Sequence, residues 1–442
     1  MAPPEVTVVG AGLAGCEAAW QLAIRGVSVR LWDMKPGRYT PAHRSPLLAE
    51  LVCSNSLRGD RLENAAGLLK AELRRLGSLI LACADEARVP AGGALAVDRE
   101  DFARRVTARV EAHPRIVRWE GEVETVPEGD CIVATGPLTA GALAADIRRL
   151  LGGGCTLYFF DAAAPLVSFE SLDMDRAWFG SRYGRGDDYI NCPLDKVEYL
   201  AFREALASAE EAGVHGFEDA RVFEGCMPVE VMARRGEDTL RYGPLKPVGL
   251  RSPDGRAHYA VLQLRRDNAA GTVYNLVGCQ THLTFGEQKR VFALIPALRR
   301  AEFLRYGVMH RNTYLDAPRL LTEQYALRRA PHIVFAGQMT GVEGYVESCA
   351  SGLTAGIGMA RRLYGSAPLR WPETTAVGAL ARYIANPAVT EFQPMNINFG
   401  LLPPLDRPVR AKAERYAALS ARALAETEAL CPEIWEHLEN KT

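Results

Sequence analysis

The first 33 residues constrain the fold of this chain more than any other segment. V-T-V-V-G-A-G-L-A-G is followed by C-E-A-A-W-Q-L-A-I-R and then by G-V-S-V-R-L-W-D. This is the pattern of a β-strand, a glycine turn, an amphipathic helix of about eleven residues and a second strand. Gly10 suits the tight turn, Gly12 lets the backbone approach a pyrophosphate, and Gly15 lets the helix pack closely on the strand. The segment therefore predicts a Rossmann-like α/β domain that binds a dinucleotide.

Two further features of this segment indicate an adenosine-containing ligand. The N-terminus of the predicted helix presents unpaired backbone N–H groups to phosphates. Asp33 ends the second strand 23 residues after Gly10, where a carboxylate can accept hydrogen bonds from ribose hydroxyls. A glycine turn that serves packing alone explains neither Asp33 nor the spacing. The predicted cofactor-binding residues here are Gly10, Ala11, Gly12, Leu13, Ala14, Gly15 and Asp33.

A second glycine-rich segment lies far along the chain. C-I-V-A-T-G at 131–136 and H-I-V-F-A-G at 332–337 are both apolar strands that end in small residues, and the second is followed by a glycine-rich loop and a helix of small residues. Small residues allow close approach of a flat cofactor, and a helix N-terminus stabilises negative charge on a reduced flavin. Packing of helix on sheet is the alternative explanation. The candidate cofactor residues in this segment are Gly337, Gln338, Tyr345 and Glu347.

The separation of these two segments predicts an insertion. We expect a discontinuous dinucleotide-binding domain, residues 1–157 and 313–442, and an inserted smaller α/β domain, residues 158–312. The insertion contains the apolar run L-Y-F-F, a helix near 200–212 and two strands that flank R-R-D-N-A-A-G. A Pro-rich loop and a helix near 411–430 are expected to cover the first domain.

Composition narrows the class of protein. The chain has 442 residues, of which 48% are hydrophobic and 24% charged, and a net charge of −1, which excludes disordered and fibrous classes. We find no apolar run long enough for a membrane span and no export signal. The ten cysteines lie at least 24 residues apart, so no zinc or redox-pair spacing is present. We therefore expect a cytoplasmic protein with reduced thiols and no metal.

Charge is unevenly distributed along the chain. Residues 288–329 carry nine Lys or Arg against three acids, and residues 360–422 carry nine against four. With the two acids between them, 288–422 has a net charge of +9. This stretch is a candidate surface for nucleic-acid phosphates, and a solvated face is the alternative.

Longer motifs resemble a known family. They are V-V-G-A-G-L-A-G, C-S-N-S-L-R-G-D, E-N-A-A-G-L-L-K-A-E-L-R-R-L-G-S-L-I, E-G-C-M-P-V-E, Q-T-H-L-T-F-G-E-Q-K-R-V-F, G-V-M-H-R-N-T-Y and A-G-Q-M-T-G-V-E-G-Y-V-E-S. Together they resemble the TrmFO family of folate- and FAD-dependent tRNA (uracil-5-)-methyltransferases. That family is related to the MnmG (GidA) flavoproteins, which modify the wobble uridine of tRNA.

The resemblance implies a reaction and its partners. FAD is the expected cofactor, and methylenetetrahydrofolate and NAD(P)H are the expected co-substrates. The expected product is ribothymidine at position 54 in the T loop of tRNA, formed by methylation of uracil C5, together with tetrahydrofolate. The choice between NADH and NADPH and the oligomeric state stay open. Three alternatives also stay open: an FAD-dependent oxidoreductase acting on a small molecule, a wobble-uridine enzyme like MnmG, and a non-catalytic flavoprotein that binds RNA.

Two cysteines are the catalytic candidates that this reaction needs. Methylation of uracil C5 requires a thiolate that adds at C6 and a group that removes the C5 proton. A reactive thiolate needs partial exposure and neighbouring positive charge or donors. Cys53 lies in the polar turn C-S-N-S-L-R-G-D with Arg58 nearby, and Cys226 lies in G-C-M-P-V-E. We predict that these two act together, with their division of labour open. Cys192, in I-N-C-P, is a further loop candidate.

Three more residues are candidates for folate or substrate binding. The resemblance implies that His282, in Q-T-H-L, stacks on the folate, and a structural histidine is the alternative. Arg311 and Asn312, in M-H-R-N-T, could hold a carboxylate, a phosphate or the edge of the flavin. Each also suits an ordinary capping or ion-pair role.

Overall fold

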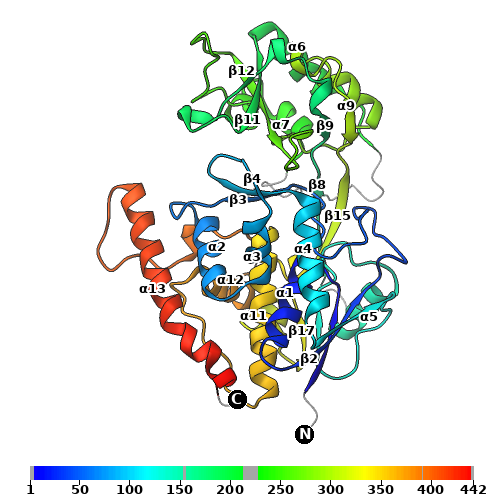
Figure 1. Ribbon diagram of the computed structural model, residues 1–442, viewed down its shortest axis with the longest axis vertical. Coiled ribbons are helices and arrows are strands. Elements are labelled where there is room, and N and C mark those ends of the chain that lie inside the picture. The colour runs from blue at the N-terminus through cyan, green and yellow to red at the C-terminus, as the bar shows by residue number, and fades with distance from the viewer. Residues whose placement is uncertain (1–3, 153–155, 213–226, 391, 440–442) are drawn as a thin grey trace.

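The computed structural model describes residues 4–152, 156–212, 227–390 and 392–439. It has two lobes, a larger one that contains both chain ends and a smaller one formed by the middle of the chain (Figure 1). Each lobe has its own hydrophobic core, built from residues 6–151 and 314–434 in the larger lobe and from residues 167–301 in the smaller. This mixed α/β architecture confirms the predicted fold class.

A six-stranded sheet forms the centre of the larger lobe. Its strand order is β16-β17-β7-β1-β2-β6, with β1 next to β2 and β7. All neighbours run parallel except β16 and β17. The strands are β1 (Glu5–Val9), β2 (Ser28–Asp33), β6 (Ile116–Glu120), β7 (Cys131–Val133), β16 (Ala326–Leu327) and β17 (Ala330–Phe335).

Helices pack around this sheet. Figure 1 shows α13 along the outer edge of the larger lobe, where it packs on α2. The helices are α1 (Leu13–Ala23), α2 (Ala65–Arg75), α3 (Leu79–Glu86), α4 (Arg99–Ala112), α5 (Gly141–Leu151), α10 (Ala317–Leu320), α11 (Tyr345–Leu363), α12 (Ala376–Ala385) and α13 (Lys412–Glu439). A small antiparallel sheet of β3 (Ser56–Gly59), β5 (Ala94–Val97) and β4 (Arg88–Val89) lies toward the smaller lobe (Figure 1).

The smaller lobe is built on a six-stranded antiparallel sheet. Its order is β10-β11-β12-β13-β9-β14. The strands are β9 (Leu166–Ser168), β10 (Trp178–Phe179), β11 (Tyr189–Leu194), β12 (Ala260–Arg266), β13 (Val273–Leu276) and β14 (Phe303–Arg305). Its helices are α6 (Lys196–Ser208), α7 (Val229–Arg235), α8 (Thr239–Tyr242) and α9 (Phe285–Phe292).

A two-stranded ribbon joins the lobes. β8 (Thr156–Ala162) pairs antiparallel with β15 (Met309–Leu315) over seven residue pairs, including Tyr158 with Thr313 and Phe159 with Asn312. The boundaries expected at 158 and 312 therefore lie inside paired strands. Both strands also run toward the larger lobe (Figure 1). The ribbon is therefore a single element that connects the two lobes.

Two helix expectations and one loop expectation differ from the structure. The helix expected near 200–212 is α6, which begins four residues earlier because Asp195 and Glu198 form a capping box. The helix expected near 411–430 extends to Glu439. The prediction that Cys192 lies in a loop is wrong, because this residue is fully buried in β11. Pro193 suggested a loop, but β10 pairs with β11 only at Ile190 and Asn191, so the missing N–H of the proline interrupts no ladder.

Candidate functional site

The glycine turn after β1 lines a cavity of about 300 Å³. Gly10 has φ +97°, and a Cβ there would lie 2.6 Å from the Ala134 carbonyl oxygen. A Cβ on Gly15 would lie 1.7 Å from the carbonyl oxygen of Gly10. At Gly12, by contrast, a Cβ would meet nothing within 4 Å, so this position borders open space. The first and third glycines are thus required by the fold, and the second leaves room for a ligand. Ala11, Leu13 and Ala14 also line the cavity.

The carboxylate predicted to bind ribose lies at the same cavity. Asp33 ends β2 and is 7% exposed. Its Oδ1 accepts a hydrogen bond from the backbone N–H of Lys35 at 2.9 Å, which fixes the orientation of the carboxylate. The cavity also contacts Gly136, three residues after the end of the neighbouring parallel strand β7, so it lies at the carboxyl edge of the sheet, the usual ligand position in this class of fold.

The late glycine segment completes this cavity from the other side. Gly337, Gln338 and Tyr345 all line it. Gly337 has φ +83° and its N–H donates to the Ser351 hydroxyl at 2.7 Å. The N-terminus of α11 therefore meets the same space as the N-terminus of α1, although the two lie more than 300 residues apart.

The small residues inside α11 serve packing rather than cofactor contact. A Cβ on Gly352 would lie 2.2 Å from the carbonyl oxygen of Ala14, and one on Gly356 would lie 2.8 Å from that of Ala18. These glycines let α11 pack directly on the backbone of α1. The glycines in the body of α11 therefore serve close packing, which was the alternative explanation for them, while the first turn of the helix faces the cavity.

A second cavity, of about 320 Å³, adjoins the first and contains Cys53. Val52, Pro137, Leu138, Gln338 and Tyr345 line both cavities. The second is also lined by four residues that the sequence motifs had singled out, from three separate motifs: Cys53, Arg58, Asn312 and Glu347. The fold thus brings Cys53, Asn312, Gln338, Tyr345 and Glu347 around one space, next to the space bounded by the glycine turn.

Tyr345 lines both cavities, and its hydroxyl contacts the Cys53 loop. The Tyr345 oxygen accepts hydrogen bonds from the backbone N–H groups of Cys53, at 2.7 Å, and Ser54, at 3.2 Å. Burial raises the pKa of this phenol, and the two N–H donors oppose that rise. Tyr345, the first residue of α11, therefore fixes the backbone of the Cys53 loop through its hydroxyl.

Glu347 and Arg58 form an ion pair at the wall of the second cavity. Arg58 Nη1 lies 3.1 Å from Glu347 Oε1, and the Glu347 side chain is 1% exposed. Glu347 Oε1 also accepts from the Ile397 N–H at 3.1 Å. Arg58, which was noted for its nearness to Cys53 in sequence, is thus turned toward α11 by this pair.

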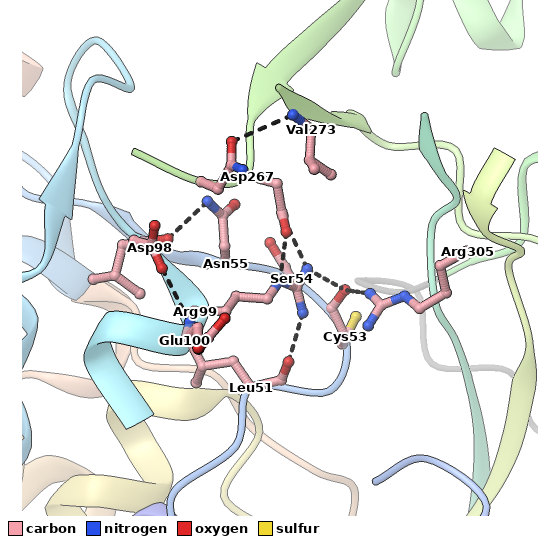
Figure 2. Close-up of polar contacts among 12 residues, drawn as sticks. Leu51, Cys53, Ser54, Asn55, Asp98, Arg99, Glu100, Asp267, Val273 and Arg305 are labelled. Carbon is pink, nitrogen blue, oxygen red and sulfur yellow. Dashed lines mark hydrogen bonds and ion pairs between the residues drawn. The ribbon is translucent and has the colours of Figure 1, made fainter. Parts of the chain in front are cut away.

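Three arginines hold the Cys53 loop from the smaller lobe and from α4, and the sequence analysis missed all of them. Arg305 Nη2 donates to the Cys53 carbonyl oxygen at 3.1 Å, and Arg99 Nη2 donates to the same oxygen at 3.3 Å (Figure 2). Arg265 Nη2 donates to the Ser54 hydroxyl at 2.7 Å. In the sequence these residues stand in ordinary strand and helix contexts, so only their clustering in space reveals them.

The remaining predicted residues lie elsewhere or outside the described part. His282 is buried and lies between two carboxylates, with Nδ1 2.5 Å from Glu230 Oε1 and Nε2 against Glu211. Burial disfavours its charge, but these carboxylates raise the pKa of His282 overall. It does not line the cavity that contains Cys53. Arg311 pairs through its backbone with Phe160 in the ribbon. Cys226 lies outside the described residues.

Comparison with known proteins identifies the family. A family model described as "Glucose inhibited division protein A" matches residues 5–367. The proteins named methylenetetrahydrofolate--tRNA-(uracil-5-)-methyltransferase TrmFO from Moorella thermoacetica and from Streptococcus equi subsp. zooepidemicus are 59% and 54% identical to this chain. These alignments cover 98% and 96% of this chain and 97% and 98% of the relatives. The chain belongs to the TrmFO family.

Solved structures show the same fold at lower sequence identity. The structure of Aquifex aeolicus GidA in its form I crystal is similar over 98% of this chain and 76% of that chain, with a TM-score of 0.70 and 15% identity. The form II crystal gives a TM-score of 0.69. The predicted resemblance to TrmFO and its GidA relatives and the predicted Rossmann-like fold are thereby confirmed.

The residues at the first cavity fit the FAD that TrmFO membership implies. Open space at Gly12 admits a pyrophosphate beside the N-terminus of α1, and the oriented Asp33 carboxylate admits a ribose. Among the described residues, we find no group of three or more His, Cys, Asp or Glu side chains that could hold a metal ion. Within those same residues, no helix has both the length and the apolar character to cross a membrane.

Proposed function

We propose that this chain methylates uracil C5 in the T loop of tRNA, at position 54, with FAD as cofactor and methylenetetrahydrofolate and NAD(P)H as co-substrates. One observation carries the proposal: the cavity of Cys53 adjoins the dinucleotide cavity, and Gln338 and Tyr345 form walls of both. The names of the TrmFO relatives supply the reaction and the substrates.

The balance of the reaction defines what must enter the site. Uracil C5 loses a proton and gains a methyl group, whose carbon comes from the methylene unit of methylenetetrahydrofolate. Two electrons from NAD(P)H complete the methyl group, so tetrahydrofolate and oxidised nicotinamide nucleotide leave. FAD, when bound, supplies the redox chemistry that this conversion needs.

The chain's own contribution is to activate and orient the pyrimidine. We assign Cys53 as one of two thiols that act on the ring, by addition at C6 or by removal of the C5 proton. Cys226 is assigned the other role. The Tyr345 hydroxyl and the guanidinium groups of Arg99 and Arg305 fix the Cys53 backbone on both sides, so the thiol has a defined position relative to the dinucleotide cavity.

We further propose that residues 1–157 and 313–442 form the FAD-binding domain and that 158–312 form the inserted substrate domain. Two separate hydrophobic cores support this division. Asn312 and Arg311, on the connecting ribbon, are proposed to hold a carboxylate, a phosphate or the edge of the flavin, and His282 is proposed to stack on the folate. We place the reaction in the cytoplasm, where tRNA and reduced thiols coexist.

A single labelling assay tests the proposed function. The flavin-loaded protein is incubated with unmodified tRNA, NAD(P)H and methylenetetrahydrofolate that carries a labelled methylene group. Label is expected in ribothymidine after nucleoside digestion. Label at a wobble uridine would favour the GidA-like alternative, and NAD(P)H oxidation without label in tRNA would favour a small-molecule oxidoreductase.

The cysteine assignment has its own test. Ser at either Cys53 or Cys226 should retain FAD and lower the rate of methylation by about 10³-fold, which corresponds to about 4 kcal/mol of transition-state stabilisation. Cys192→Ala serves as the control, because that thiol is buried in β11. A tRNA with 5-fluorouridine at position 54 should form a covalent adduct with one of the two cysteines. Wild-type rates in both serine variants would refute the assignment.

A further inference from the structure

The turn between β12 and β13 reaches from the smaller lobe into the larger one. This is the R-R-D-N-A-A-G segment, closed by a hydrogen bond from the Asp267 N–H to the Val273 carbonyl at 2.8 Å. Its Arg266 carbonyl accepts from Asn55 Nδ2 at 3.0 Å, and its Ala269 N–H donates to Asp98 Oδ2 at 2.9 Å. The turn therefore contacts both the Cys53 loop and the N-terminus of α4.

Arg99, the first residue of α4, is the centre of this contact (Figure 2). Its Nε and Nη2 donate to the two Asp267 carboxylate oxygens at 2.8 and 3.1 Å. The same guanidinium donates to the carbonyl oxygens of Leu51, at 2.5 Å, and Cys53, at 3.3 Å. The side chains of Arg99 and Asp267 are 16% and 6% exposed.

The shape of the guanidinium explains why this arrangement matters. Its N–H groups lie in one plane at fixed angles. A bidentate carboxylate therefore fixes the plane of the whole group, not only its position. When Asp267 orients Arg99, the remaining N–H groups are aimed at the two carbonyls on either side of Val52. The path of the backbone that carries the Cys53 thiol then depends on a residue of the other lobe.

We propose that Arg99 and Asp267 are positioning residues for the Cys53 thiol: the ion pair between the lobes sets the geometry of the Cys53 loop. This rests on the catalytic assignment of Cys53 above. Neither side chain lines the cavity that contains Cys53, so both act through the loop backbone. The competing explanation is an ion pair that only holds the two lobes together.

Three variants separate these explanations. Asp267→Asn leaves Arg99 without its carboxylate, and Arg99→Gln leaves the Asp267 carboxylate without its bidentate partner, although Arg265 and Arg305 still attract it. Each is therefore expected to lower the melting temperature. The double variant Arg99→Gln/Asp267→Asn removes both charges and is expected to recover much of that loss. One glutamine amide cannot donate to the Leu51 carbonyl, the Cys53 carbonyl and the side chain of residue 267 at once. The double variant therefore still lacks the full set of contacts to the loop.

The kinetic readout is the rate of tRNA methylation by flavin-loaded protein at a temperature where every variant is folded. We expect the double variant to have kcat about 10- to 100-fold below wild type, with KM for tRNA and methylenetetrahydrofolate within about twofold. Arg99→Lys keeps the charge but loses the planar fork, so its kcat should be intermediate. Asp101→Asn removes a partly exposed carboxylate that pairs with Arg104 and Arg105 of the same helix and should match wild type.

Amide hydrogen exchange gives a readout that does not depend on activity. Peptides that contain residues 51–56 should exchange at least about tenfold faster in the double variant than in Asp101→Asn, while exchange in α11 stays unchanged. A double variant with wild-type kcat and wild-type exchange at 51–56 would overturn the proposal, as would recovery of kcat in parallel with melting temperature. If the wild-type protein methylates no tRNA, the proposed function fails, and the exchange comparison still decides whether Arg99 and Asp267 position the loop.

Discussion

Gly12 and Gly15 stand three residues apart in one turn, yet a methyl group should have opposite effects at the two positions. At Gly15 a Cβ meets the Gly10 carbonyl oxygen at 1.7 Å, so Gly15→Ala should destabilise even the flavin-free protein, by about 1–3 kcal/mol or more. At Gly12 the space is open, so Gly12→Ala should fold normally and lose at least about tenfold in FAD affinity. Melting of the apoprotein and a flavin titration measure the two effects. Wild-type FAD affinity in Gly12→Ala would contradict the assignment of the cavity.

Tyr345 offers a second test at the level of one atom. Tyr345→Phe removes the hydroxyl that accepts from the N–H groups of Cys53 and Ser54 and leaves the ring in place. Two part-buried N–H groups lose their acceptor, at a cost of about 1 kcal/mol each, so the loop should shift and the methylation rate should fall about tenfold with flavin retained. The control is Tyr383→Phe, whose hydroxyl donates to the Gln393 carbonyl and which lines neither cavity. Equal rates in the two variants would refute this role of Tyr345.

These residues also show how far sequence can predict a site. The glycine turn and Asp33 were predictable because their tasks are set by neighbours within one strand–helix–strand unit. Arg99 and Asp267 were not, because they lie 168 residues apart and meet only when two lobes dock. Cys53 is intermediate: its polar turn suggested a reactive thiol, but its contacts with Tyr345 and Arg305 come from segments 292 and 252 residues away.

At the scale of elements, Glu72 links α2 to the start of α12. Its carboxylate accepts the N–H groups of Ala376 and Val377 at 2.8 and 2.9 Å. Burial raises the pKa of Glu72 to about 8, and these two N–H groups oppose the rise. An acid whose pKa is higher in the folded state makes the folded protein lose stability as pH rises from the unfolded pKa, about 4.3, toward that value.

Glu72→Gln tests this linkage. The glutamine has one acceptor oxygen, so at pH 5 the variant should be less stable than wild type by about 1 kcal/mol or more. Glutamine cannot ionise, so the variant should not lose the stability that wild type loses through Glu72 between pH 5 and 8. The difference in stability between the two proteins should therefore narrow as pH rises. Thermal melting at pH 5, 6.5 and 8 measures this difference, with Glu426→Gln, an exposed position of α13, as the control. A gap that stays constant from pH 5 to 8 would show that the group is ionised throughout and would contradict the raised pKa of Glu72.

Element boundaries show a further limit of sequence reasoning. Local patterns located α1, α11 and the strands around them because hydrophobic periodicity and glycine position suffice for these elements. The proline of I-N-C-P obscured β11, since its acceptability depends on where β10 stops pairing. That information resides in the sheet and not in the segment itself.

At the scale of the whole molecule, carboxylates neutralise part of the positive charge of residues 288–422. Several arginines of this stretch are paired with carboxylates, as in Arg290–Glu287, Arg319–Asp316, Arg361–Glu433, Arg362–Asp130 and Arg382–Glu373. Arg299 and Arg300 are exposed on the smaller lobe, and no carboxylate partner is seen for them among the described residues. They are therefore the better candidates for tRNA phosphates.

Reversing these two charges should weaken tRNA binding. For Arg299→Glu/Arg300→Glu we expect the slope of log affinity against log salt to fall in magnitude by about 2, with flavin content unchanged. Arg104→Glu/Arg149→Glu changes the net charge equally at arginines that pair within their own helices and should keep the wild-type slope. Measurement of tRNA affinity across a salt series compares the two double variants. A wild-type affinity that ignores salt would show that this surface is merely solvated.

The order of the strands in the large sheet has a consequence for synthesis of the chain. β7 and β17 are neighbours in the sheet, but the whole smaller lobe is translated between them. The smaller lobe can therefore complete its core while the ribosome still holds β17 and α11. During that interval the face of α1 that receives Gly352 and Gly356 has no partner, and the sheet ends at β7. The nascent protein thus completes its smaller lobe first and closes its larger lobe last, so the Cys53 loop acquires its final contacts, with Arg305 and Tyr345, only late in synthesis.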